Sequence, residues 1–195
     1  GIGKVGSNKL TLDQANTYTG PTILLGGTLE LTDDDAIGSS SEVQIIEGEL
    51  VVNADVNLND LILDAPNLTV DGTGSLNFAP DSVIADRYIN PAGSSSPDIC
   101  TISIGISGSP KVEMTKSHLQ GTQVGCSTLR FEPSASGTQT LGDIEFNHPA
   151  GSQAARVILA GSEDSTENTL GSVYKVAAHS YNQYLTVEGP AKWTL

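Results

Sequence analysis

The chain has 195 residues, with 9 Lys and Arg against 23 Asp and Glu, which gives a formal net charge of -14 at pH 7. This charge repels phosphate backbones and anionic lipid headgroups, so it argues against nucleic-acid partners and membrane-surface binding. The 21 glycines and an aromatic content of 5% disfavour a helical bundle and favour many short strands joined by turns. No apolar run reaches transmembrane length, so we expect no direct membrane insertion.

The densest pattern is LTLDQANTYTGPTILLGGTLEL, residues 10–31, in which two runs of alternating leucines flank a polar segment. Asn tolerates a left-handed backbone and can bond the backbone within a bend, Tyr offers an apolar face with a polar tip, and Gly allows a tight corner. Thr has a high β-propensity. We therefore expect a corner and a stacking platform between two strands. The expected corner residues are Asn16, Tyr18, Gly20 and Gly27.

Residues 8–38 resemble the autotransporter-associated β-strand repeat, also called the passenger-associated transport repeat. The resemblance rests on Asn16-Thr17-Tyr18-Thr19-Gly20, Gly27-Thr28-Leu29 and Ala36-Ile37-Gly38, in that order and spacing. Asp13-Gln14 stands where the family usually has Ser/Thr-Gly. The resemblance implies a right-handed parallel β-helix in large secreted or surface-anchored bacterial proteins. In these the repeat is a structural spacer that aids export, and it brings no catalytic residues.

Independent of this resemblance, pairs of apolar residues spaced by one recur over residues 1–80, which is the period of a strand with one buried face. From Val43 to Phe78 the pairs follow at short, even intervals, too tight for long hairpins with a core of their own. The pattern predicts β-solenoid coils. The alternative, an antiparallel sandwich, would need two-residue turns, for which Asp71-Gly72 is the one candidate.

Residues 81–99 break the alternation with prolines and a serine run, and we expect an irregular insertion or join there. Residues 100–195 predict a further β region with longer, less even strands. The sequence leaves open whether the solenoid continues there or gives way to a sandwich-like part. Cys100 and Cys126 suit one disulfide in an oxidising compartment. We expect no metal and no cofactor, because two cysteines and three scattered histidines do not make a zinc site.

The last four residues, Lys192–Leu195, repeat the form of Lys9–Leu12 and are similar to a second, partial start of the same repeat. Together with an N-terminal Gly1 in place of Met, this predicts a part of something longer, either one unit of a tandem array or a subunit whose ends stack. An uncapped solenoid end exposes core leucines and unpaired backbone groups. The expected contact residues between units are Leu10, Leu12, Trp193 and Leu195.

Carboxylates occur in groups such as Asp33-Asp34-Asp35 and Asp143 with Glu145, but their Gly, Ser and Asn neighbours are typical of solvated turns. No Gly-x-Ser-x-Gly nucleophile motif is present. The triple Asp also lacks the alternation of a calcium loop. We therefore expect no enzyme and no catalytic residues. An exposed aromatic platform for a sugar could come from Tyr181 and Tyr184.

The sequence thus predicts an acidic, secreted, extracellular or cell-surface structural module with an all-β solenoid fold. Its expected partners are copies of itself or adjacent tandem units, in a fibre, stalk or passenger domain. The alternative is a carbohydrate-binding or carbohydrate-cleaving β-helix, with Tyr181 and Tyr184 as possible glycan contacts.

Overall fold

The computed structural model describes residues 1–38, 42–87, 98–114, 127–133, 137–146, 155–161, 167–175, 183–190 and 192–195. Within these ranges every regular element is a strand, and all paired strands run parallel. The prediction of an all-β parallel solenoid is confirmed. The described residues contain no helix of the length and apolarity that a bilayer span requires.

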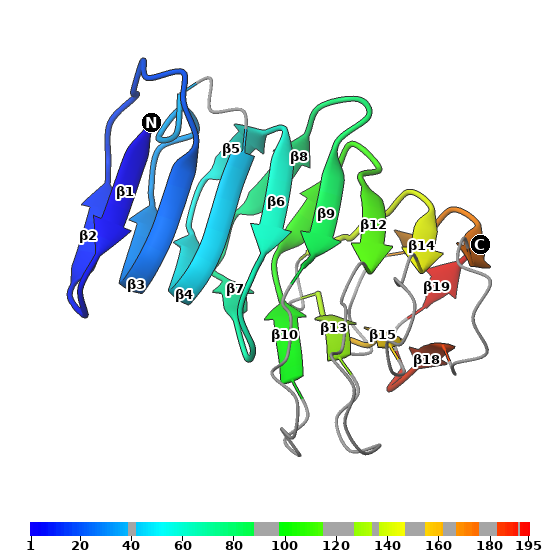
Figure 1. The fold of residues 1–195 in the computed structure, drawn as a ribbon. Coiled ribbons are helices and arrows are strands. Elements are labelled where there is room, and N and C mark those ends of the chain that lie inside the picture. Colours follow the sequence, from blue (N-terminus) through cyan, green and yellow to red (C-terminus); the bar gives the residue numbers. More distant parts are fainter. Residues whose placement is uncertain are drawn as a thin grey trace.

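The strands stack in three columns along the axis of the solenoid (Figure 1). The first two columns form a 14-stranded sheet within the described residues, because the long strands β3 (Thr22–Leu31) and β4 (Glu42–Val52) run through both. The first column also holds β1 (Ile2–Val5), β6 (Asp60–Leu63), β9 (Val83–Asp86), β12 (Lys111–Met114), β14 (Ile144–Phe146) and β17 (Val173–Lys175). The second also holds β2 (Lys9–Leu12), β7 (Thr69–Asp71), β10 (Asp98–Ile102), β13 (Ser127–Phe131), β15 (Ala155–Leu159) and β18 (Gln183–Val187).

The third column is shorter and consists of two small sheets joined by isolated bridges. It holds β5 (Asp55–Leu58), β8 (Ser75–Phe78), β11 (Gly105–Ser107), β16 (Asn168–Thr169) and β19 (Trp193–Thr194). The bridges pair Ile106 with Gln139 and Thr140 with Thr169, so residues 139–140 continue the column between β11 and β16. One circuit through the columns makes a coil. The described strands define eight coils, from coil 1 at β1 to coil 8 at β17.

The core is a set of rows, each made of one inward residue from every coil. The clearest row follows the second column, where each residue is the register partner of the next. Its members are Leu10, Leu29, Leu50, Val70, Ile102, Phe131, Leu159 and Val187. The six interior members are fully or almost fully buried. Burying a Leu, Val, Ile or Phe side chain contributes about 1.5–3 kcal/mol, so such rows hold the coils together.

The solenoid continues through the second half of the chain, because β10, β13, β15 and β18 stack in the second column in parallel register. What changes is the connection between the first two columns, which lengthens from residues 64–68 in coil 4 to 115–126 in coil 6. The segment 81–99 contains β9, which belongs to the first column, and residues 88–97, which lie outside the described ranges. The three-part division of the chain stays a prediction.

Candidate functional site: the repeat corner, the polar ladders and the end coils

Asn16 joins the first two coils in the segment between β2 and β3, where the sequence predicts a corner. Its Nδ2 donates hydrogen bonds to the carbonyl oxygens of Ala36 at 2.7 Å and Gln14 at 3.0 Å, and its backbone N–H donates to the Asp35 carbonyl at 3.0 Å. Gly38 lies against the same segment at a φ of 57°, so close that a Cβ there would collide with the Asn16 carbonyl. The Asn-Thr-Tyr and Ala-Ile-Gly ends of the motif therefore meet in space.

Tyr18 and Gly20 complete this corner. The Tyr18 hydroxyl and Thr22 Oγ1 lie 2.7 Å apart and share a hydrogen bond, and the ring packs against the core. Burial raises the pKa of the Tyr18 phenol above its ordinary value, and the hydrogen bond with Thr22 partly offsets this. A Cβ on Gly20 would lie 2.6 Å from the Gly1 nitrogen. These residues fill packing and hydrogen-bonding roles.

Gly27 stands at the corner between the first two columns, beside a buried lysine that sequence reasoning missed. A Cβ on Gly27, whose φ is 72°, would lie 2.5 Å from the carbonyl oxygens of both Gly6 and Asn8. The Lys4 ammonium donates to the carbonyls of Gly6 at 2.7 Å and Gly26 at 2.8 Å, and the residue is only 7% exposed. Lys4 is the register partner of the buried Leu24, so it occupies an inward position of β1. The alternation of side chains along β1 was the sequence signal for this burial.

Buried amides replace apolar residues in the inward row of the third column, which sequence reasoning also missed. Gln139 is fully buried, and its Nε2 donates to the carbonyls of Ile102 at 3.0 Å and Ile104 at 2.9 Å. Asn168, also fully buried, accepts from the Gln139 backbone N–H at 2.9 Å and donates to the Lys192 carbonyl at 3.3 Å. Together they link coils 5 to 8.

Coil 8 leaves core positions open to solvent. Val187 and Leu185 stand in register with buried residues of β15, yet they are 59% and 37% exposed. At the other end Leu10 and Leu12 are partly buried and pack against the core. Both ends therefore present apolar side chains.

The segments Lys9–Leu12 and Lys192–Leu195 do not occupy equivalent places. Lys9–Leu12 is β2 of the second column, whereas Trp193–Thr194 is β19 of the third. Trp193 Nε1 donates to the Ala160 carbonyl at 3.3 Å, and Leu195 is 85% exposed. In a stack of identical coils, Leu10 would meet coil 8 at β18 and not at Trp193.

The candidate carboxylates serve turns and coil-to-coil contacts. Asp33 Oδ1 accepts the Asp35 N–H at 2.9 Å, and Asp143 Oδ1 accepts the Ser172 N–H at 2.8 Å. Glu145 accepts from Lys111 at 2.9 Å and from the Tyr174 hydroxyl at 3.2 Å. Desolvation and then Glu145 raise the pKa of Tyr174 above its ordinary value. Among the described residues, no three His, Cys, Asp or Glu side chains gather as metal ligands would.

Tyr184 is 40% exposed, and the Arg156 guanidinium lies 5.5 Å from its ring centroid, so a cation already occupies one ring face. Tyr181 lies outside the described residues, so the glycan-contact pair stays a prediction. The disulfide does too: Cys126 is not among the described residues, and the part of the chain that is described holds no disulfide. Cys100 is buried, and its Sγ donates a weak hydrogen bond to the Ala65 carbonyl at 3.4 Å.

These coils define a parallel β-solenoid, in which Asn16, Gln139 and Asn168 bond neighbouring coils to each other. Residues 3–31 match the family model described as passenger-associated-transport-repeat. The chain therefore carries a passenger-associated transport repeat over these residues, from β1 to the end of β3. The matched span contains two corners, one with Asn16, Tyr18 and Gly20 and the other with Gly27. No curated protein and no solved structure matches the chain.

Proposed function

We propose that the chain is a structural module of a secreted or surface-exposed bacterial protein, whose coils continue end to end in a fibre, stalk or passenger domain. The passenger-associated transport repeat at residues 3–31 supports this class of protein. The observation that carries the stacking itself is the inward row of the second column. It begins at the partly buried Leu10 and ends at Val187, which is apolar and exposed.

In such a stack, the contacts between units would follow the register of the columns. A coil like coil 1 placed on coil 8 would bring Leu10 over Val187 in the second column. In the first column it would bring Ile2 over Val173, since each of these residues ends the same row. The new strand would satisfy backbone N–H and C=O groups that an end strand leaves without a ladder partner. Trp193 and Leu195 would face the segment after β2.

A structural role without catalysis fits the same contacts. The Asp33, Asp143 and Glu145 carboxylates each hold a turn or a neighbouring coil through a hydrogen bond. Groups engaged in this way do not have the paired, substrate-facing arrangement that general acid and base catalysis needs. We therefore infer that the chain is not an enzyme.

Sedimentation velocity over a wide concentration range tests the stacking. We expect concentration-dependent association that increases with salt, because two chains of net charge -14 repel each other. Val187→Asp should abolish the association. Ile99→Asp is the control, since Ile99 is also an exposed apolar residue but lies on β10, away from both ends. A chain that stays monomeric at every concentration, with end strands that exchange their amides freely, would refute the proposal.

A further inference from the structure

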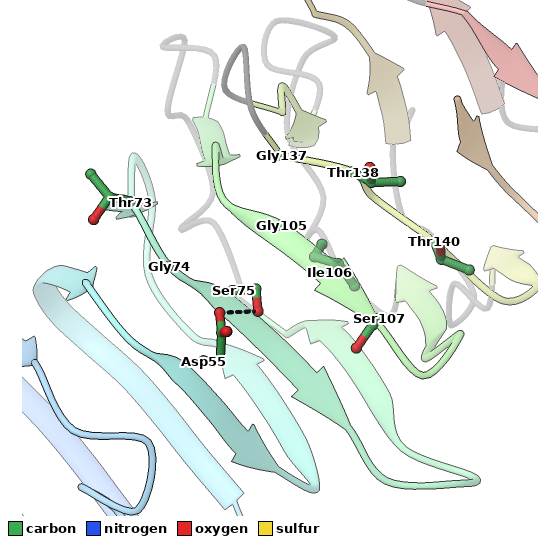
Figure 2. A pocket seen from close by; sticks show the side chains of 10 residues that line it. All are labelled: Asp55, Thr73, Gly74, Ser75, Gly105, Ile106, Ser107, Gly137, Thr138 and Thr140. Atoms are coloured by element: carbon green, nitrogen blue, oxygen red, sulfur yellow. Dashed lines mark hydrogen bonds between the residues drawn. The ribbon is translucent and has the colours of Figure 1, made fainter. Parts of the chain in front are cut away.

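The outer face of the third column is hollowed into an open groove with a volume of about 320 Å3. Figure 2 shows it crossing several strands, with Asp55 and Ser75 at one side and Thr138 and Thr140 at the other. Gly105 lies between these residues. Because it has no side chain, the groove is deeper at this position.

Two of the lining residues, Ser107 and Thr140, belong to a row of uncharged polar residues along the solenoid axis. Each member is the register partner of the next or is aligned with it by the bridge beside it. The row consists of Asn57, Asn77, Ser107, Thr140, Thr169 and Thr194. Each side chain is exposed or partly exposed. Since parallel strands lie about 4.8 Å apart, the row presents amides and hydroxyls at an even spacing over six coils.

The lining chemistry excludes most ligand classes. Of the described residues that line the groove, none is Lys or Arg, which disfavours an anion, and Asp55 is the one carboxylate, too few for a divalent cation. Ile106 is buried, so the surface offers little apolar area to a hydrophobic ligand. A peptide would bind by extending a sheet edge, but β5, β8 and β11 already pair with each other here.

Hydroxyl-rich ligands remain. Ser, Thr and Asn side chains each donate and accept hydrogen bonds, and so do the hydroxyls of a sugar. An open groove aligned with an evenly spaced row suits a long chain better than a compact molecule. The net charge of -14 disfavours acidic polymers. We propose that this groove binds a linear, uncharged glycan along the solenoid axis, at a site that does not include Tyr184 of β18.

Side chains that line the groove can still form hydrogen bonds with such a ligand. Asp55 Oδ1 accepts a hydrogen bond from Ser75 at 2.8 Å (Figure 2). Ser107 donates at 2.7 Å to Oδ1 of Asn77, its neighbour in the polar row, so both side chains are held in place. The second carboxylate oxygen of Asp55 and the lone pairs of the hydroxyls can still accept bonds. No aromatic side chain is among the described residues that line the groove, so binding depends on many weak contacts and longer glycans should bind more tightly than short ones.

Affinity gel electrophoresis of the full chain tests the groove, with hydroxyethylcellulose, galactomannan and soluble starch as neutral probes and polygalacturonate as an acidic one. We expect retardation by at least one neutral probe, little dependence on salt, and none by polygalacturonate. Thr140→Arg should weaken it by at least about tenfold, equivalent to about 1.4 kcal/mol. Thr101→Arg, which places the same side chain on β10 of the second column, should leave it unchanged.

No retardation by any of the three neutral probes, stronger retardation by polygalacturonate, or an equal loss in T101R would overturn the proposal. Melting curves show whether T140R is folded. If T140R is not folded, Thr140→Val is the deciding variant, because it removes the hydroxyl and keeps the shape of the side chain. Weaker glycan binding by T140V supports the proposed groove, and unchanged binding contradicts it. This result is independent of end-to-end stacking, which sedimentation without glycan reports.

Discussion

The side-chain amide of Asn16 donates a 2.7 Å hydrogen bond to the backbone carbonyl of Ala36, 20 residues later and one coil further along the solenoid. Asn16 lies within the residues that match the repeat model, and Ala36 follows them. The bond gives Asn16 a structural role, because it joins the first two coils. An amide at this place satisfies two backbone carbonyls that a corner would otherwise leave to water.

Asn16→Ala should therefore destabilise the chain by about 1–3 kcal/mol, because it leaves the Ala36 carbonyl without its donor. Urea unfolding measures this. Gln14→Ala is the control, since the Gln14 amide bonds only the adjacent Asp13 carbonyl on the surface, and it should have little effect. Equal midpoints for both variants would show that the Asn16 contact contributes nothing.

Gly48 should tolerate no side chain. Its φ is 110°, and a Cβ would collide with the Gly27 carbonyl of the coil below, so Gly48→Ala should cost several kcal/mol, about 3 or more, or prevent folding. Gly3→Ala provides the comparison, because a Cβ at Gly3 meets nothing within 4 Å. Thermal melting should leave G3A close to the original chain, and a mild G48A would mean that the stacked corner can open.

Gln139→Leu should destabilise coils 5 to 8. The substitution keeps the volume but removes the donor to the Ile102 and Ile104 carbonyls, which costs about 1–3 kcal/mol for a buried group left without its partner. Hydrogen exchange should show the loss in β11 and β13 more than in β3. Uniform loosening of all coils would instead indicate that the chain unfolds as a single cooperative unit.

Acid should weaken the contact between Arg130 and Glu132. The Arg130 guanidinium lies 2.7 Å from Glu132, and this hydrogen bond holds the pKa of that carboxyl below its ordinary value of 4.5. A lowered folded-state pKa adds stability that is present above the ordinary value and is lost as the pH falls through the lowered one. Glu132→Gln should flatten the stability profile below about pH 4.5, whereas Glu47→Gln, on an exposed residue, should keep it. Parallel profiles for both would contradict this assignment.

Much of this fold follows from the alternation of apolar residues, because a residue such as Leu50 must point inward if Val52 does. In coils 3 and 4 the short connections keep that spacing regular, and the solenoid is predictable. In coils 5 to 8 the connections between the first two columns are long, so the same coils look uneven in the sequence. The sequence therefore does not exclude a sandwich-like second half. The structure does, because β13 and β15 pair in parallel register.

The corner prediction at Asn16, Tyr18 and Gly20 rests on the distinct backbone and packing preferences of Asn, Tyr and Gly. Lys4, Gln139 and Asn168 were not predicted, because polar side chains are expected to face water and all three are buried here. Their burial depends on carbonyl groups supplied by other coils, which no local pattern reveals. The sequence also does not reveal that Lys9–Leu12 lies in the second column and Trp193–Thr194 in the third, because both segments have the pattern of the same short strand.

Electron microscopy of the concentrated chain tests the central claim, that coils continue from one unit to the next. Eight coils at about 4.8 Å each predict unbranched filaments with an axial repeat of about 38 Å. The same filaments should be missing for Val187→Asp. Single particles at every concentration, or filaments that survive in V187D, would contradict the account.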